Sequence, residues 1–204
     1  MDNAVIGLTG PTGAGKSTVC AVWVRMGCAV VDADRIAREA VSLPECLLAL
    51  QKEYGADLVN VQGVLDRKLL AARAFSTPQK AAQLNRITHP VILKMISARL
   101  EQLRKAQPVV LDAPLLFESG AERFCTKTAA VIAPQKVRLE RIMKRDGITA
   151  EQGSARMSAQ QQDSYYTSRA DYVLDGSVPL QELDLAAQNL LTQIIGESDE
   201  TNST

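Results

Sequence analysis

The chain has 204 residues, a length that suits one α/β domain with a modest insertion. Its 23 basic and 23 acidic residues balance, so nucleic acid and anionic membranes are not expected as global partners, and the 4% of aromatic residues disfavours a platform for stacked bases. The four cysteines form no C-x-x-C pair and His89 is the one histidine, so a zinc site is not expected.

The same survey leads us to expect a cytoplasmic protein with reduced thiols. No apolar run approaches the length of a membrane span. The first expected strand begins within a few residues of the N-terminus and leaves no room for a signal peptide. Reduced cysteines are the normal state in that compartment.

The first expected element is a buried strand over Ala4–Leu8, which leads into a phosphate-binding pattern. Gly10-x-x-x-x-Gly15-Lys16-Ser17 fits the P-loop pattern G-x-x-x-x-G-K-[ST]. The glycines let backbone N–H groups turn toward a phosphate, and the following helix adds a positive partial charge. The residues expected to bind ATP here are Thr12, Gly13, Ala14, Gly15, Lys16, Ser17 and Thr18.

Two of these residues have further expected roles. Lys16 supplies a positive charge to the β- and γ-phosphates, and the Ser17 hydroxyl is a ligand for Mg²⁺. The alternative is a plain glycine-rich turn, which would leave Lys16 without a purpose at the start of a helix, where a cation is unfavourable.

A second strand over Cys28–Val31 is followed directly by Asp32-Ala33-Asp34. Alternation along an extended segment would send both carboxylates to the same side. Near a P-loop, this pair suggests a base for a hydroxyl nucleophile and a partner on the metal side. The alternative is that one of them caps the next helix.

About 75 residues separate the second strand from the third, and the stretch between them is expected to be helical. The helices expected there are Ala37–Tyr54, Asp66–Phe75, Pro78–Arg86 and Pro90–Ala106. Pro44, Pro78 and Pro90 stand near expected helix starts, where proline is tolerated. The length favours a substrate cover over a plain crossover. His89 would lie between two helices, as a packing or capping residue or on the substrate side.

Three further strands are expected over Val109–Leu111, Ala129–Ile132 and Tyr172–Leu174. Short apolar strands separated by helices predict a parallel sheet, whose carboxyl ends gather around the P-loop. Asp112 follows the third strand as the aspartate of a Walker B element does. This position predicts a water-mediated contact between Asp112 and Mg²⁺.

A helix from Ala133–Gln135 to Arg145, closed by Gly147, places Arg138, Arg141 and Arg145 on one face. A second helix, about Ala150–Gln162, adds Arg156. The pair suggests a lid whose arginines reach phosphates. The alternative is a solvated face paired with Glu140 and Asp146. The polar tail from Glu197 is expected to be disordered.

These segments together resemble the dephospho-CoA kinases. The matching segments, in chain order, are Ile6-Gly7-Leu8-Thr9-Gly10, Gly13-x-Gly15-Lys16-Ser17-Thr18-Val19, Val31-Asp32-Ala33-Asp34-x-x-Ala37-Arg38, Leu65-Asp66-Arg67, His89-Pro90, Asp112-Ala113-Pro114-Leu115-Leu116-Phe117-Glu118, Arg141-x-x-x-Arg145-Asp146-Gly147, Arg156-x-x-x-Gln160 and Ala170-Asp171-Tyr172-Val173-Leu174-Asp175.

The resemblance implies transfer of the ATP γ-phosphoryl to the ribose 3′-hydroxyl of dephospho-CoA, which yields CoA and ADP with Mg²⁺ as cofactor. It implies an α/β, three-layer P-loop NTPase fold with a five-stranded parallel sheet, a helical substrate-binding insertion and a lid. The core would comprise residues 1–36 and 107–196, with the lid at about 136–162, the insertion 37–106 and the disordered tail 197–204.

The resemblance also implies roles for single residues. Asp34 falls on the catalytic aspartate, with Lys16 and Arg141 as further catalytic residues. Arg145 joins the ATP-binding residues. The residues implied on the substrate side are Thr9, Asp34, Arg38, His89 and Leu115.

Some residues depart from the family pattern, and other classes remain as alternatives. Pro11-Thr12 stands where the family commonly has Gly-Ile, Gln161–Tyr166 replaces a stretch that often carries Glu-Lys, and Gly176 replaces a common Asn. The main alternative is another P-loop small-molecule kinase, for a nucleotide, a nucleoside or shikimate. The guanine motif Asn-Lys-x-Asp of a GTPase switch and the Leu-Ser-Gly-Gly-Gln of an ABC ATPase are both absent from the sequence.

Overall fold

A computed structural model describes the backbone of residues 3–201 and the side chains of residues 3–197. The chain divides into two compact units. The first runs to Asp32 and resumes at Arg99, and the second is Ala33–Ala98. The insertion expected from the sequence, 37–106, overlaps this second unit but starts and ends later.

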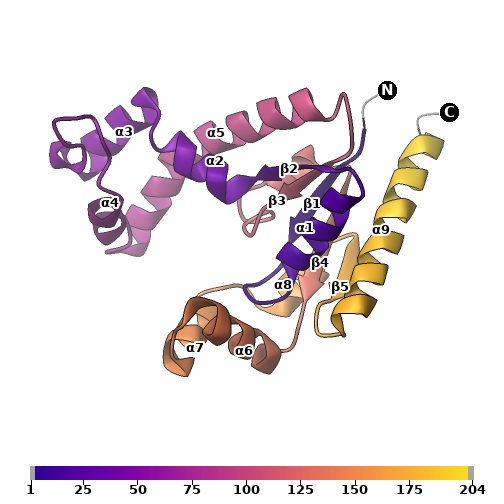
Figure 1. Ribbon diagram of the computed structural model, residues 1–204. Helices are drawn as coiled ribbons and strands as arrows, with labels where there is room; N and C mark the ends of the chain where they lie inside the picture. Colours follow the sequence, from indigo (N-terminus) through magenta and orange to yellow (C-terminus); the bar gives the residue numbers. More distant parts are fainter. Residues whose placement is uncertain (1–2, 202–204) are drawn as a thin grey trace. The chain divides into compact units, whose positions relative to one another are not determined.

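The first unit is built on a parallel five-stranded sheet (Figure 1). Its strands, in chain order, are β1 (Val5–Thr9), β2 (Ala29–Asp32), β3 (Val109–Asp112), β4 (Lys127–Ile132) and β5 (Tyr172–Asp175). Their order in the sheet is β2-β3-β1-β4-β5. The prediction of a five-stranded parallel α/β sheet is therefore confirmed, and each expected strand is found within a residue or two of its expected bounds.

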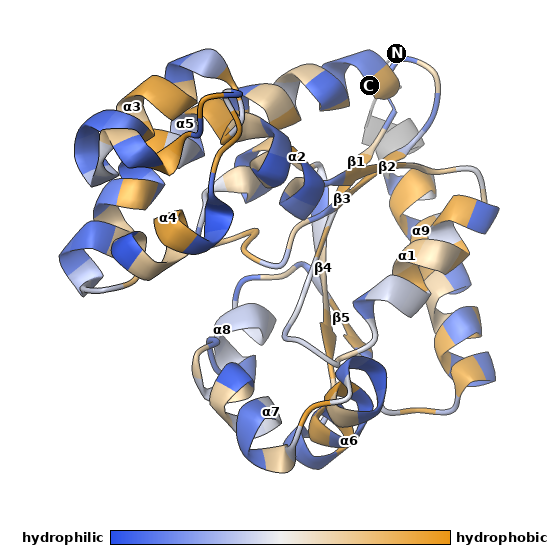
Figure 2. Ribbon diagram, turned by 60° about the vertical axis from the view of Figure 1, so that its left-hand side comes forward, coloured by the Kyte–Doolittle hydropathy of each residue, from blue (hydrophilic) through white to orange (hydrophobic). Residues whose placement is uncertain are grey.

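The strand register brings polar carboxyl ends together at one edge of this sheet. Leu8 of β1 pairs with Asp112 of β3, and Asp112 in turn pairs with Asp32 of β2. On the other side, Thr9 pairs with Ala130. All five residues of β1 are buried, because neighbouring strands and helices cover this central strand. Figure 2 shows the sheet strands as a largely apolar layer.

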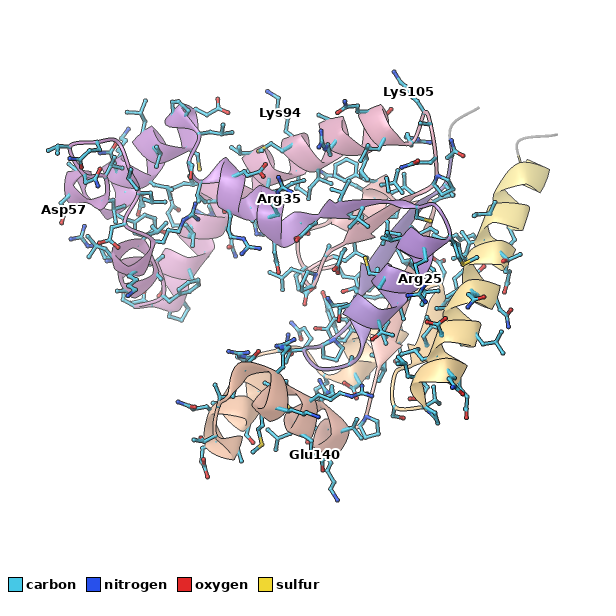
Figure 3. The ribbon with its side chains drawn as sticks, in the orientation of Figure 1. Arg25, Arg35, Asp57, Lys94, Lys105 and Glu140 are labelled. Atoms are coloured by element: carbon cyan, nitrogen blue, oxygen red, sulfur yellow. The ribbon has the colours of Figure 1, made fainter. Side chains whose placement is uncertain are left out.

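Helices α1 (Lys16–Arg25) and α9 (Leu180–Thr201) lie side by side against this sheet (Figure 1). Trp23 is fully buried between them, and its Nε1–H donates to the Ala187 carbonyl at 2.8 Å. Arg25, labelled in Figure 3, pairs with Asp184 across the same contact at 2.6 Å. These contacts hold the helix that follows the P-loop against the sheet.

The remaining helices of the first unit are α6 (Gln135–Asp146), α7 (Ala150–Ser158), α8 (Asp163–Thr167) and the short η2 (Ala121–Phe124). Gly147 ends α6 in the left-handed conformation, as expected. The second lid helix is shorter than predicted, because Gln162 is extended and a new helix starts at Asp163. Thr149 and Gln152 form a capping box that starts α7.

The second unit is helical. It contains α2 (Ala33–Ala40), α3 (Pro44–Tyr54), η1 (Ala56–Leu58), α4 (Arg67–Ala74) and most of α5 (Pro78–Leu103). Its apolar cluster comprises Cys46, Leu50, Tyr54, Leu58, Leu65, Leu70 and Ala74. Arg73 clamps the fold of this unit: it donates to both carboxylate oxygens of Asp57 at 2.7 Å and to the Tyr54 carbonyl at 2.6 Å. Asp57 is labelled in Figure 3.

Two helix predictions in this unit are wrong. The expected helix Ala37–Tyr54 is two helices, because Leu43 before Pro44 is extended and Pro44 opens α3. Conversely, two separate helices were expected on either side of His89-Pro90. The structure has a single helix there, α5, with Pro90 inside it. The Thr88 hydroxyl bonds the Leu84 carbonyl at 2.9 Å in that turn, and His89 is a helical residue rather than a residue of a connection.

Two further expectations need correction. Helix α2 begins at Ala33, directly after β2, so Asp34 lies in a first helical turn and strand alternation does not relate it to Asp32. The backbone of α9 continues to Thr201, whereas a disordered tail was expected from Glu197. Tyr172 and Lys127 hold Glu197 through its carboxylate at 2.8 and 3.2 Å, which stabilises the end of the helix. Residues 202–204 of the expected tail lie outside the described residues.

Candidate active site

The P-loop joins β1 to α1 and is shaped by close backbone approaches. Gly10 has φ 136°, and a side chain there would overlap the Val131 carbonyl oxygen of β4. Gly13 has φ 78°, and a Cβ atom on it would lie 2.7 Å from the Arg138 carbonyl oxygen. Because only glycine fits both conformation and space, the loop can pass close to two neighbouring segments.

The loop ends in the first turn of α1, whose N–H groups lack partners within the helix. Gly15 precedes this turn in the left-handed conformation, and Thr18 and Val19 donate back to its carbonyl at 3.0 and 3.3 Å. The amides of Lys16 and Ser17 come before these bonds, at the positive end of the helix, which is a favourable place for a phosphate.

Lys16 and Asp112 form an ion pair at the carboxyl edge of the sheet. The Lys16 Nζ lies 3.2 Å from Asp112 Oδ1, and the two side chains are 16% and 26% exposed. Asp112 ends β3, which pairs directly with β1. The structure thus brings together the two residues that sequence reasoning assigned to phosphate and to Mg²⁺.

Cys20 lies one turn after Lys16 on α1, and its pKa is affected by both charges of the Lys16–Asp112 pair. Burial and then the Asp112 carboxylate raise the pKa of Cys20 to about 11, while Lys16 acts in the opposite direction. The cysteine is therefore a protonated neighbour of the ion pair at neutral pH, not a nucleophile.

The lid arginines do not share one environment, although their spacing predicted a common face. Among the described contacts, Arg141 is the one of these whose guanidinium donates hydrogen bonds to the P-loop: its Nη1 lies 3.3 Å from the Gly13 carbonyl and 3.4 Å from the Ala14 carbonyl. Arg138 is buried and pairs with Asp163 of α8 at 3.2 Å.

Arg145 and Arg156 converge instead on Asp146. Arg145 donates to both carboxylate oxygens at 2.7 and 2.9 Å, and Arg156 bonds one of them. Hydrogen bonds from Arg145 and then Arg156 lower the pKa of Asp146 to about 2. This contact corresponds to the solvated-face alternative for these two residues, with Asp146 as the partner.

Thr9 and Leu115, both expected on the substrate side, belong to this edge of the first unit. Thr9 is buried, and its hydroxyl donates to the Pro114 carbonyl at 3.3 Å. Leu115, the next residue, is 57% exposed. Thr9 therefore holds the turn after β3 against β1, and Leu115 is available to a ligand.

Two residues at the P-loop were not given a role by sequence reasoning. Gln160, quoted only as part of a motif, accepts a hydrogen bond from the Thr12 N–H at 2.9 Å. A side chain at Gly176 would overlap the Ala14 carbonyl oxygen, so glycine at this departure from the family pattern allows the turn after β5 to approach the loop. Sequence signals existed for both, but a residue type in a motif does not reveal its contact.

Asp34, Arg38 and His89 belong to the second unit. Arg38 Nε donates to the Asp34 carbonyl at 3.1 Å within α2, and the Arg38 carbonyl accepts from Arg67 at 2.8 Å. His89 is half-buried in α5, and burial lowers its pKa, so the imidazole is neutral at pH 7. Arg67, from the segment Leu65-Asp66-Arg67, thus ties α4 to the end of α2 within this unit.

The described residues contain neither a metal-binding cluster nor a membrane-spanning helix. Over that part of the chain, histidine, cysteine and acidic side chains form no cluster of three or more that could hold a metal ion. The described helices include none with the length and apolar character needed to span a membrane.

The sheet order, the P-loop and the Lys16–Asp112 pair define a P-loop protein that binds a nucleoside triphosphate. The dephospho-CoA kinase family model matches residues 4–182. A dephospho-CoA kinase of Deinococcus radiodurans is 42% identical over 195 residues, which cover 93% of this chain and 91% of that protein.

Two further relatives agree. A dephospho-CoA kinase of Corynebacterium diphtheriae is 40% identical over 189 residues, covering 91% of this chain and 94% of the relative. The crystal structure of TT1252 from Thermus thermophilus superposes with a TM-score of 0.80 at 34% identity, covering 95% of this chain and 98% of that one. The chain therefore belongs to the dephospho-CoA kinase family, and it is an ATP-dependent kinase.

Proposed function

We propose that this protein transfers the γ-phosphoryl group of ATP to the 3′-hydroxyl of the dephospho-CoA ribose, releasing CoA and ADP. The observation that carries the proposal is the Lys16–Asp112 pair beside a P-loop, in a chain that matches this family over residues 4–182. The family match favours dephospho-CoA over the acceptors of other P-loop small-molecule kinases.

On the nucleotide side, the proposed work is positioning and charge neutralisation. The amides of Gly15, Lys16 and Ser17 would bind the phosphates, and the Lys16 ammonium would neutralise charge on the β- and γ-oxygens. In the nucleotide-bound state Arg141 would turn from the Gly13 and Ala14 carbonyls toward the transferring group, because a phosphate oxygen is a stronger partner than a neutral carbonyl. Arg145 would exchange the Asp146 carboxylate for a phosphate oxygen, which replaces one charged acceptor with another.

On the acceptor side, Asp34 is proposed to accept the proton of the 3′-hydroxyl. The hydroxyl oxygen then bonds to the γ-phosphorus as the bond to the β–γ bridging oxygen breaks and ADP leaves. Arg38, His89, Thr9 and Leu115 are the proposed substrate-side residues. A neutral His89 would act through hydrogen bonding or packing rather than through charge.

The residues at the sheet edge fit a magnesium ion carried in with ATP. Mg²⁺ prefers oxygen ligands and keeps several waters, so the Ser17 hydroxyl and a water-mediated contact to Asp112 would suffice beside the phosphates. When bound, the ion would neutralise charge on the β- and γ-oxygens. We also propose a cytoplasmic location, consistent with four cysteines that form no disulfide.

The test is an acceptor panel with Mg·ATP and equal concentrations of dephospho-CoA, AMP and shikimate. Release of ADP gives the rate, and mass spectrometry of the product identifies the phosphorylated acceptor. We expect kcat/KM for dephospho-CoA to exceed the other two by a wide margin. Lys16→Ala protein, purified identically, controls for a contaminating kinase. A higher kcat/KM with AMP or shikimate would sink the assignment.

A further inference from the structure

Gln160 joins the segment after α7 to the P-loop across 148 positions of sequence. Its Oε1 accepts from the Thr12 N–H at 2.9 Å. The residue is half-buried and lies just beyond the end of α7, where its own N–H donates to the Met157 carbonyl at 3.1 Å. The side chain is therefore held at its base by the helix end while its amide oxygen engages the loop.

This contact removes a hydrogen-bond donor from the first half of the P-loop. Pro11 has no N–H. The Ala14 N–H donates to the Pro11 carbonyl at 3.2 Å, and the Thr12 N–H is taken by Gln160. The donors that this leaves for a phosphate are those from Gly15 onward, at the start of α1.

The same lid segment contacts the loop's carbonyl groups as well. Arg141 Nη1 lies near the Gly13 and Ala14 carbonyls, and the Gly13 backbone packs directly against Arg138. Gln160 accepts from the N–H of Thr12, and Arg141 donates to the carbonyl oxygens of Gly13 and Ala14. The segment from α6 to Gln160 therefore binds both the donors and the acceptors of this part of the loop. The ion pair between the buried Arg138 and Asp163, whose side chain is 39% exposed, anchors that segment to α8.

We propose that Gln160 is a positioning residue that holds the P-loop in its phosphate-receiving shape through the Thr12 N–H. The inference rests on the ATP-dependent function proposed above and concerns its nucleotide half. The loop shape is needed equally for ADP, for ATP and in the transition state. Loss of the bond should therefore weaken binding of both nucleotides by a similar factor and change kcat less.

The neighbouring glutamines provide matched controls. Gln160 lines a polar cavity of about 690 Å³ together with Gln135, Arg138, Gln161 and Gln162. Gln161 and Gln162 are exposed, and neither is hydrogen-bonded to the loop among the described contacts. A substitution at Gln161 thus alters the same cavity and leaves the bond to Thr12 in place.

The experiment compares Gln160→Met, Gln160→Glu and Gln161→Met. Methionine keeps the length of the side chain without an oxygen acceptor, and glutamate keeps the acceptor. Calorimetric titration gives the Kd for ADP, which needs no acceptor substrate. Amide exchange measured by NMR reports the Thr12 N–H directly, and the Tm of each variant reports the fold. The added charge of glutamate changes affinity in any loop shape, so amide exchange is its deciding readout.

We expect Gln160→Met to weaken ADP binding about fivefold, the effect of one hydrogen bond, and to speed exchange of the Thr12 amide. Gln160→Glu should keep that amide protected, and Gln161→Met should bind ADP within about twofold of the parent. Should Gln160→Met fail to fold, Gln160→Ala tests the same bond with less side chain to accommodate.

Two outcomes would overturn the proposal. One is unchanged ADP affinity in Gln160→Met, with or without faster exchange at Thr12, which would make the bond a structural detail. The other is an equal loss of affinity in Gln161→Met. Neither outcome depends on the substrate that accepts the phosphoryl group. If dephospho-CoA proved to be the wrong substrate, ADP affinity would still test the role of Gln160.

Discussion

The Lys16–Asp112 pair and the cluster around Asp146 are both ion pairs on this unit, but they differ in how they are held. Lys16 and Asp112 are 96 residues apart and meet because β1 and β3 are neighbours in the sheet. Their side chains are mostly buried, at 16% and 26% exposed. The position of the Lys16 charge is thus set by the sheet itself.

The Asp146 cluster depends on local sequence. Arg145 is the adjacent residue and Arg156 is ten residues away, with side chains 59% and 48% exposed, whereas the Asp146 side chain that they share is 23% exposed. Ion pairs with such exposed arginines gain little free energy, because water competes for the guanidinium groups. The comparison suggests that the sheet edge supplies preorganised charge, whereas the lid supplies arginines that can change partner at small cost.

The largest effect should follow from removing the preorganised charge. We expect Lys16→Ala to lower kcat by roughly 10³–10⁵-fold, the range for a cation that neutralises a transferring phosphoryl group. The Tm should stay within a few degrees of the parent, because Asp112 is left partly exposed to water. Steady-state kinetics and thermal melting on one sample check both. Near-normal turnover of a folded variant would contradict the phosphate role of Lys16.

Asp34 tests whether the second unit supplies the base. Asp34→Asn keeps the shape and removes the proton acceptor, so kcat should fall by about 10²–10⁴-fold with the Kd for ATP changed far less. Part of that loss can come from hydroxyl orientation. The alternative is a stabilising acid in the first turn of α2, whose loss lowers Tm by a few degrees and spares kcat. A destabilised but fully active variant would remove the base assignment.

Arg141 lies between the two regions, on a lid helix but in contact with the loop. Arg141→Ala should lower kcat by about 10²-fold and weaken ATP binding less, because the guanidinium acts mainly on the transition state. Arg156→Ala, a substitution in the Asp146 cluster, is the matched control and should lose less. Equal kcat values for Arg141→Ala and the parent enzyme would show that the carbonyl contacts in the structure are all that Arg141 makes.

The sequence predicted the sheet well, because buried strands leave a local signal. Each short β-branched run, such as Val109–Leu111, became a strand, and the P-loop glycines matched a motif with a strict spatial requirement. The helix that carries Arg138, Arg141 and Arg145, closed by Gly147, was also predicted correctly, and their spacing predicted a shared face. It did not predict their partners, because Asp163 reaches Arg138 from another helix.

Helix ends in the second unit were harder to predict for a physical reason. Pro44 and Pro90 have the same local chemistry, yet Pro44 begins a helix and Pro90 lies inside one. Packing over the length of α5 outweighs the missing N–H at Pro90, and packing cannot be read from local sequence. Gln160 illustrates the same limit, since its bond to Thr12 joins positions 148 apart.

The smallest effect should come from the lid cluster, and it sharpens the contrast between the two regions. Asp146→Asn removes the charge that holds Arg145 and Arg156, and kcat/KM should change less than about fivefold because both guanidinium groups are largely exposed to water. The pH dependence has a definite sign. The pKa of Asp146 is lowered to about 2 in the folded protein, below about 3.9 for an unperturbed aspartate. Its contribution to stability is therefore fully present above about pH 4 and is lost as the pH falls through about 2. Carboxyl NMR titration should show Asp146 still ionised near pH 3, and the Tm deficit of Asp146→Asn should be full at pH 7 and shrink toward zero as the pH falls below about 2. A normal titration of Asp146, or a loss of kcat/KM as large as that of Arg141→Ala, would place the cluster with the preorganised charges of the sheet edge.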